Sequence, residues 1–254
     1  MLWMRFSRRH GIEVGILDGD RVQVCSGDPF SGGMSTGEVL PTSDIQWETP
    51  CAPSKMIALW NNFHAAATKF ALGIPPDPLF FLKSPSSLCA HGSVIAAPRS
   101  YPGRVLFEGE LGVVIGKAGK DIAIADAPAY IFGYTCVNDV TAVDLLKADP
   151  SFPQWTRAKG FDAFGPFGPV IATDLDPAQL TVRTLVNGKE RQRYPVSDMI
   201  FSPAELVSLI SRDMTLLPGD VISCGTSVGA GPIPSGAMVE VHIEGIGTLS
   251  NRYQ

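Results

Sequence analysis

Short runs of alternating or wholly apolar residues, separated by turn residues, dominate the chain and predict a β-rich protein. Residues 14–17 and 21–24 flank Asp18-Gly19-Asp20, a combination typical of a β-hairpin. Residues 180–186 and 190–194 flank Asn187-Gly188, which is a stronger hairpin signal. Further strands are predicted at residues 55–59, 79–82, 104–117, 130–137, 221–223, 239–243 and 247–251.

Helical patterns are few and short. Residues 62–71 predict a short helix with Asn62 as its cap, and residues 141–148 predict another. Ser202-Pro203-Ala204-Glu205 is a capping box that begins a helix extending to Arg212. Strands and helices do not alternate as in a doubly wound sheet, and the glycines of residues 225–231 do not follow the order of a dinucleotide-binding loop. The predicted class is therefore α+β and β-rich.

Composition and charge exclude several classes of protein. The 254 residues are 45% hydrophobic and carry a net charge of -5, so a globular core is expected and general nucleic-acid binding is not. The start of the sequence lacks the pattern of a secretory signal, and no stretch reaches the roughly 18 apolar residues of a membrane span. Five widely spaced cysteines without a CxxC pair indicate reduced thiols, and we expect a cytoplasmic protein.

Two glutamates in an apolar strand are the first chemical signal. Side chains alternate along a strand, so Glu108 and Glu110 lie on one face, about 7 Å apart. Asp139 follows the apolar residues 130–137 and adds a third carboxylate. Three carboxylates without a nearby thiol or imidazole suit a hard cation, best Mg²⁺, with Mn²⁺ and Ca²⁺ as alternatives. Spacing alone equally allows Glu108 and Glu110 to lie on the solvated face of an edge strand.

Several motifs in a fixed order resemble one family. FEGELGVVIGK (residues 107–117) and GYTCVND (133–139) are similar to the metal-binding strands of the fumarylacetoacetate hydrolase family. The remaining matches are FLKSP (81–85), AKGFD (158–162), LVNG (185–188), MIFS (199–202), LPGD (217–220) and CGT (224–226). They extend over roughly residues 53–252, so the combination is far more specific than any single motif.

The resemblance implies a fold, a metal and a substrate class. It implies a mixed β-sheet roll with few short helices at residues 53–254, preceded by a small N-terminal β domain at residues 1–52. It implies that Glu108, Glu110 and Asp139 hold Mg²⁺ or Mn²⁺. A 2-oxo acid would chelate that metal, which would polarise the ketone and stabilise an enolate. A homodimer is also implied, with no nucleic acid or membrane as partner.

The histidine of the family's lid helix has one candidate here. That histidine usually activates water together with a glutamate three residues later, and imidazole suits the task because it titrates near neutrality. His64 is the candidate base, but Ala67 occupies the position of the glutamate, and the alignment needs a gap. An ungapped match places Ala66 at the histidine position. The alternative is that His64 is a structural residue of the lid.

Five other residues are candidate site residues. Lys159 resembles the active-site lysine of the family, where its charge would neutralise an enolate, and Asp162 is a candidate to orient it. Lys83 ends an apolar strand and either contacts the substrate or pairs with the acidic site. Thr226 is a candidate to bind the substrate carboxylate through its hydroxyl and backbone N–H. Arg157 is a candidate substitute for a family arginine whose position holds valine here.

Three functions follow from this resemblance. The first is a metal-dependent hydrolase that cleaves a C–C bond in an acylpyruvate- or fumarylacetoacetate-type diketo acid. The second is an isomerase or decarboxylase of the 2-hydroxyhepta-2,4-diene-1,7-dioate isomerase or oxaloacetate decarboxylase type, which needs no hydrolytic water and is favoured by Ala67. The third is a catalytically silent family member, which the three retained carboxylates argue against. The fold alone cannot decide among them.

Overall fold

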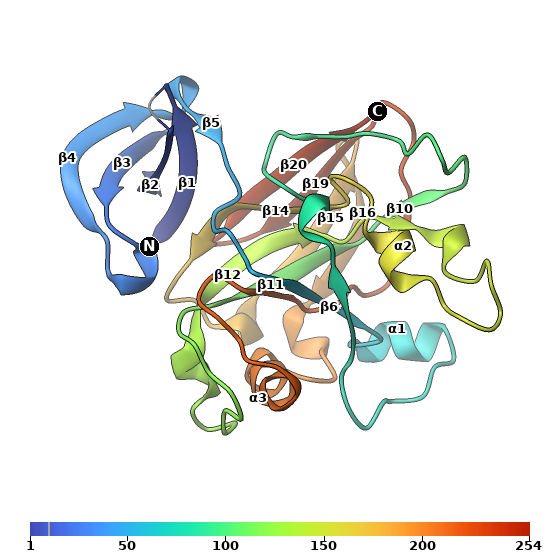
Figure 1. Ribbon diagram of the computed structural model, residues 1–254. Coiled ribbons are helices and arrows are strands. Elements are labelled where there is room, and N and C mark those ends of the chain that lie inside the picture. The colour runs from blue at the N-terminus through green and yellow to red at the C-terminus, as the bar shows by residue number, and fades with distance from the viewer. Residues whose placement is uncertain (10) are drawn as a thin grey trace.

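The computed structural model describes residues 1–9 and 11–254, whose strands form one large sheet and two smaller sheets (Figure 1). The large sheet has the order β4-β3-β2-β1-β14-β12-β11-β17-β6-β7, with β5 paired to β1 and β8 paired to β14. Its strands are β1 (Leu2–Arg8), β2 (Gly11–Asp18), β3 (Arg21–Ser26), β4 (Met34–Pro41), β5 (Gln46–Trp47), β6 (Met56–Trp60), β7 (Leu79–Lys83), β8 (Leu88–Cys89), β11 (Gly109–Ile115), β12 (Ile131–Asn138), β14 (Gly165–Ala172) and β17 (Val221–Ser223).

The two smaller sheets complete the roll. One has the order β16-β15-β19-β20-β9 and the other β13-β10-β18. Their strands are β9 (Val94–Ile95), β10 (Val105–Phe107), β13 (Thr141–Ala142), β15 (Thr181–Val186), β16 (Lys189–Pro195), β18 (Gly231–Pro232), β19 (Met238–Ile243) and β20 (Gly247–Tyr253). The main core lies between the large and the five-stranded sheet, where Leu111 and Val113 of β11 pack with Val241 and Ile243 of β19.

The helices are short and lie at the periphery of the sheets. They are α1 (His64–Lys69), α2 (Trp155–Lys159) and α3 (Pro203–Asp213). The predicted capping box begins α3, because Ser202 accepts from the Glu205 backbone while the Glu205 side chain accepts from Ser202. The predicted β-rich α+β roll with few short helices is confirmed. Among residues 1–9 and 11–254, no helix combines the length and apolar character that crossing a membrane requires.

Strands β1–β5 form a separate lobe in Figure 1, drawn in blue. The lobe joins the roll through β1, which pairs with β14 at Leu2 and Trp3. The large sheet therefore continues from the N-terminal strands into the strands of the roll. The division at residues 52 and 53 stays a prediction.

Both predicted hairpins are present. Asp18 pairs with Arg21 at the turn between β2 and β3. Asn187 and Gly188 have φ angles of 50° and 73°, the positive values that a type I′ turn between β15 and β16 requires. Local turn chemistry was sufficient for both predictions.

Three other local predictions need correction, and strand β14 was not predicted. Residues 141–148 are not an α-helix but β13 and a 3-10 turn (Val143–Leu145), because β13 pairs with β10 and the Asp144 carboxylate accepts from the Arg104 backbone. Asn62 does not cap α1, since its amide donates to Phe201 and Cys224 carbonyls. The single strand at residues 104–117 is divided into β10 and β11 at Glu108. Strand β14 was missed because its glycines and prolines are unusual within strands.

Candidate metal centre and active-site cavity

Three carboxylates meet where β10, β11 and β12 come together. Glu110 lies on β11, Glu108 directly precedes that strand, and Asp139 directly follows β12. Because β11 and β12 are antiparallel, with Gly109 opposite Asn138, the start of one strand lies beside the end of the other. One carboxylate oxygen of each acidic residue lies within 4.8 Å of the others. The structure therefore brings together the three ligands that the sequence predicts.

The environment of β11 excludes the solvated alternative. This strand pairs with β12 on one side and β17 on the other, and all seven of its residues are buried. The interpretation of Glu108 and Glu110 as the exposed face of an edge strand is therefore wrong. Glu110 is fully buried and Glu108 is partly buried, so both lose solvation and repel each other, and opposite charge must be close by.

Glu110 has the least satisfied carboxylate of the cluster. Its Oε2 accepts hydrogen bonds from Ser223 Oγ at 2.5 Å and from the Gly225 N–H at 2.8 Å. Its Oε1 is buried and has no hydrogen-bond partner among the described residues. Burial, followed by the charges of Asp139 and Glu108, raises the pKa of Glu110 well above its ordinary value. A free buried carboxylate oxygen beside two other carboxylates fits a hard divalent cation that takes oxygen ligands.

Two buried lysines supply positive charge to the cluster. Lys83 ends β7 and donates to Asp139 at 2.5 Å, and Lys159 ends α2 and donates to Asp139 at 2.5 Å and to Glu108 at 2.8 Å. Burial alone would raise the pKa of Asp139, but Lys159 and Lys83 hold it below its ordinary value. Burial lowers the pKa of Lys83, whereas the three carboxylates outweigh burial and raise the pKa of Lys159. Lys159 therefore stays charged in the cluster.

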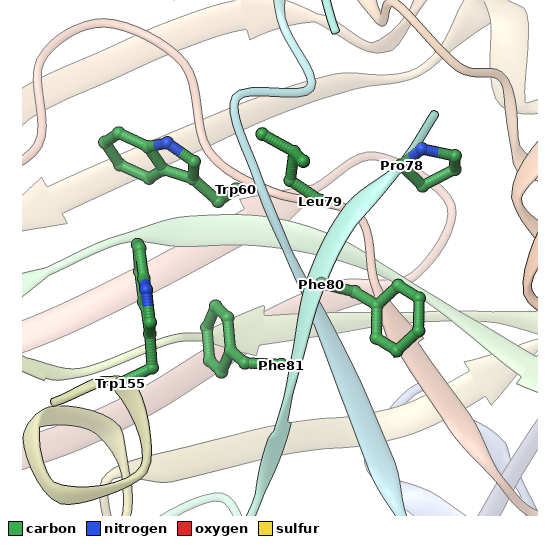
Figure 2. Close-up of a pocket in the computed structure, with 6 residues that line it drawn as sticks. All are labelled: Trp60, Pro78, Leu79, Phe80, Phe81 and Trp155. Carbon is green, nitrogen blue, oxygen red and sulfur yellow. The ribbon is translucent and has the colours of Figure 1, made fainter. Parts of the chain in front are cut away.

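Phe81, Trp155 and Trp60 form an aromatic cluster that packs beside Lys159. The Phe81 ring stacks on Trp155, with centroids 5.1 Å apart, and Trp155 lies 5.5 Å from Trp60. Figure 2 shows these three rings on one side of β7 and Phe80 on the other. The Lys159 ammonium lies 5.2 Å from the centroid of Phe81, within the range of a cation–π interaction. The cluster thus fixes both α2 and the lysine at its end.

A polar framework holds the backbone between the two glutamates. Gln192 accepts from the Gly109 N–H at 3.0 Å and donates to Thr226 Oγ1 at 2.8 Å, while Thr226 donates to the Gly109 carbonyl at 2.9 Å. A Cβ at Gly109 would lie 2.0 Å from Thr184 Oγ1, so only glycine fits there. The structure adds a positioning role to Thr226, because its hydroxyl already holds the strand that carries Glu110.

A cavity of about 610 Å³ extends from this cluster to the surface. Glu108, Thr226 and Ser227 line the end nearest the carboxylates. The rest of the lining is mostly apolar and comes from the end of β6, from α1 and the residues after it, and from residues 104–106 and 143–147. The titratable residues of the lining are Arg104, Glu108, Asp144 and Lys147.

The structure does not place His64 in this cavity. The side chain of His64 is exposed at the first position of α1, and the residues of that helix segment that line the cavity are Ala66 and Phe70. Two residues that are two positions apart on an α-helix are related by a rotation of about 200° around the helix axis. His64 and Ala66 therefore lie on nearly opposite faces of α1. Ala67 is buried. The described structure thus gives the predicted base no access to the site, and its catalytic role stays a prediction.

Arg157 and Asp162 are likewise not brought to the site. Both are exposed, and neither lines the cavity. Arg157 lies two positions before Lys159 on α2, so it faces away when Lys159 faces inward. Arg104 is the arginine that lines the cavity, where it pairs with Asp144 at 2.8 Å. No sequence pattern indicated Arg104, because its position depends on the pairing of β10 with β13.

Sequence reasoning did not predict which residues hold the cluster in place. Ser223 and the Gly225 backbone fix Glu110, and Gln192 fixes Gly109. Gln192 is buried although β16 is otherwise largely polar, and this contrast appears only once the strand is placed in the sheet. Burial of a polar side chain cannot be read from a strand with polar residues on both faces.

Comparison with known proteins places the chain in a family. Residues 55–254 match the model of the fumarylacetoacetate (FAA) hydrolase C-terminal domain, and residues 1–50 match a model described as Rv2993c-like, N-terminal. The chain belongs to the fumarylacetoacetate hydrolase family.

Three relatives show the range of activities in that family. The structure of a 5-carboxymethyl-2-hydroxymuconate delta-isomerase from Mycobacterium smegmatis is 39% identical, with a TM-score of 0.91 over 100% of this chain and 99% of that chain. The oxaloacetate tautomerase YisK of Bacillus subtilis is 39% identical over 83% of this chain and 73% of its own length. A maleylpyruvate hydrolase from Sphingobium sp. SYK-6, solved with manganese(II) and pyruvate, is 26% identical, with a TM-score of 0.81 over 100% and 98% of the two chains.

Proposed function

We propose that this protein is a Mg²⁺- or Mn²⁺-dependent enzyme that shifts a proton within a 2-oxo acid, as a tautomerase or isomerase. The observation that carries the proposal is the buried cluster of Glu108, Glu110 and Asp139 with a free Glu110 oxygen. The manganese and pyruvate of the maleylpyruvate hydrolase, in a structure of the same fold, support the cation and the substrate class.

The residues of the site have distinct tasks in this reaction. Glu108, Glu110 and Asp139 would hold the cation, which supplies Lewis-acid polarisation of the substrate ketone. The ammonium of Lys159 lies beside the cluster, where it would stabilise negative charge that develops on the substrate oxygen. Thr226 and Ser227 line the cavity next to Glu108 and bind the head of the substrate. Burial of the cluster strengthens each of these electrostatic interactions.

The lining of the cavity favours proton shift over hydrolysis. Hydrolysis needs a base that activates water, and α1 presents Ala66 and Phe70 to the cavity. Among the described residues that line it, none is a histidine. A keto–enol shift consumes no water: a proton leaves the enol oxygen and a proton is added to the neighbouring carbon, and solvent in the open cavity would carry it. The names of the tautomerase and the isomerase, both 39% identical, support this reaction class, whereas the hydrolase is 26% identical. Hydrolysis of a C–C bond stays the competing prediction.

A substrate panel with added Mg²⁺ or Mn²⁺ tests the proposal. We expect the enol of oxaloacetate to be converted faster to the keto form, measured by ultraviolet absorbance, while acylpyruvates stay intact by mass spectrometry. Glu110→Gln should remove this activity, whereas Glu244→Gln, an exposed glutamate outside the cavity, should retain it. Fragments from an acylpyruvate would identify a hydrolase, and pyruvate with CO₂ from oxaloacetate would identify a decarboxylase. Either result would contradict the proposal.

A homodimer is part of the same proposal. It is supported by family membership and by the exposed apolar residues Leu79 and Leu82 on β7, the last strand of the large sheet. Light scattering at several protein concentrations measures the mass of the particle. A mass of one chain at all concentrations would exclude the dimer.

A further inference from the structure

The cavity is much larger than the head of a 2-oxo acid requires. Its volume is about 610 Å³, and Glu108, Thr226 and Ser227 occupy only the end nearest the carboxylate cluster. A three-carbon 2-oxo acid bound at that end leaves most of the cavity empty. The remaining lining therefore determines which substituent the substrate carries at the carbon next to the ketone.

That remaining lining is an apolar wall. We define the wall by its larger side chains, which are Trp60, Phe70, Leu72, Leu106, Val143 and Leu146. Three of them retain much exposed surface in the described structure, with Trp60 at 41%, Phe70 at 58% and Leu72 at 36%. Exposed apolar side chains that converge on one cavity gain free energy when a ligand removes them from water.

The charged residues of the cavity do not favour a second carboxylate in the tail. Arg104 is paired with Asp144 at 2.8 Å, and Asp144 also accepts from the Arg104 N–H and from Tyr101 Oη at 3.0 Å each. The carboxylate of Asp144 would repel an anionic tail, since its pKa is lowered to about 2, chiefly by its bond to Arg104. Lys147 is the remaining cation of the lining, and it forms no ion pair with the described residues. Glu108 belongs to the head end, so the charges that face the tail are the mutually neutralised Arg104–Asp144 pair and the exposed Lys147, whose attraction for a tail carboxylate is screened by solvent.

We infer that the apolar wall selects, among 2-oxo acids whose tail is long enough to reach it, those with an uncharged alkyl or aryl tail; oxaloacetate, whose second carboxylate is one carbon from the ketone, tests the head end alone. The inference rests on the proposed function, because the head of the substrate must bind at the carboxylate cluster for its tail to reach the wall. Phe70 and Leu72 act as specificity-determining residues, since they contact the tail and lie outside the cluster. Trp60 joins the wall to the aromatic cluster of Phe81 and Trp155 (Figure 2), so its ring is held in place before a substrate binds.

Matched ligands test this specificity. Oxalate is the probe of the cation and the head end, while 2-oxohexanoate and 2-oxoadipate have equal chain length and differ in a terminal carboxylate. Isothermal titration calorimetry with and without Mn²⁺ measures the affinity of each ligand. We expect oxalate to bind only with Mn²⁺, and 2-oxohexanoate to bind about tenfold or more tightly than 2-oxoadipate.

Substitutions of two exposed phenylalanines, one in the wall and one outside the cavity, test whether the wall contributes to the affinity for 2-oxohexanoate. Phe70→Ser should weaken the binding of 2-oxohexanoate about tenfold and leave the binding of oxalate unchanged. Phe152→Ser is the control, because Phe152 is 66% exposed and does not line the cavity. The thermal midpoint of each variant shows whether it is folded. Trp60→Ser provides a second test of the wall if Phe70→Ser fails to fold.

The outcomes separate the two proposals. Absence of Mn²⁺-dependent oxalate binding would overturn the proposed function. Oxalate binding with equal or tighter binding of 2-oxoadipate would overturn the apolar tail while the proposed function stands. Unchanged binding of 2-oxohexanoate by folded Phe70→Ser and Trp60→Ser proteins would show that the wall does not bind the tail.

Discussion

The carboxylate cluster and helix α1 border the same cavity, but they are built in opposite ways. The cluster lies at the meeting point of paired strands, and Glu110 and Asp139 have no exposed surface. Helix α1 has six residues, lacks a side-chain cap, and is followed by Phe70 at 58% exposure. A change in the cluster disturbs a buried network, whereas a change on α1 alters a surface that tolerates substitution. Reaction chemistry and tail selection therefore reside in separate parts of this molecule.

Among substitutions that keep all three carboxylates, the largest expected effect on turnover is at Lys159. Lys159→Met removes the charge that stabilises developing negative charge, and we expect turnover to fall about 10²–10³-fold. Turnover of the oxaloacetate enol with Mn²⁺ measures this effect. Lys189→Met, a change at an exposed lysine outside the cavity, is the control. Unchanged turnover in a folded Lys159→Met protein would remove this lysine from the reaction.

Metal binding at the cluster should stabilise the folded protein. A ligand that binds only the native state at 100 times its Kd adds about 2.7 kcal/mol to the free energy of unfolding. We expect Mn²⁺ to raise Tm accordingly in the unmodified protein and in Glu244→Gln. Glu110→Gln and Asp139→Asn should lose the shift, because each removes a carboxylate ligand. An equal Mn²⁺ shift in all of these proteins would place the metal elsewhere.

A substitution at Gly109, which lies between Glu108 and Glu110, should have a moderate effect on stability and on metal binding. Gly109→Ala introduces a Cβ that would meet Thr184 Oγ1 at 2.0 Å. Overpacking of this kind costs about 1–3 kcal/mol, and it should also displace Glu108 and Glu110. Chemical denaturation and Mn²⁺ titration measure the two consequences. The double variant Gly109→Ala with Thr184→Ala should recover part of the stability, and a failure to do so would show that the contact is not the cause.

The smallest effect on turnover is expected for a substitution at His64, the first residue of α1. His64→Ala should change turnover less than about twofold, because substitutions at exposed positions away from buried networks have small effects. Steady-state kinetics with the oxaloacetate enol measures this outcome. A loss of 100-fold or more would instead support the base that the sequence predicts, and it would show that α1 turns His64 into the cavity when substrate binds.

Particular residues show how far sequence reasoning reached. Glu108, Glu110 and Asp139 were found because alternation along a strand and an apolar flank are local properties. Lys83 and Lys159 were found through motifs, and both donate to Asp139. Arg157 was predicted as a site residue but does not line the cavity, because sequence position alone does not show which face of a helix points inward. The helix predicted at residues 141–148 failed because pairing with β10 overrode local propensity.

Local patterns of residues were enough to predict the β-rich class, the hairpins at Asp18-Gly19-Asp20 and Asn187-Gly188, and the capping box of α3, because each depends on neighbours within a few residues. They also made the three carboxylates candidates, but the pairing of β11 with β12 is what brings Asp139 beside the two glutamates. Long-range packing places β11 in the interior, sets Gln192 against Gly109 and Ser223 against Glu110, and turns Ala66 and Phe70 to the cavity while His64 faces away. Those features depend on contacts between residues far apart in the chain, and their register is set by the packing of whole sheets.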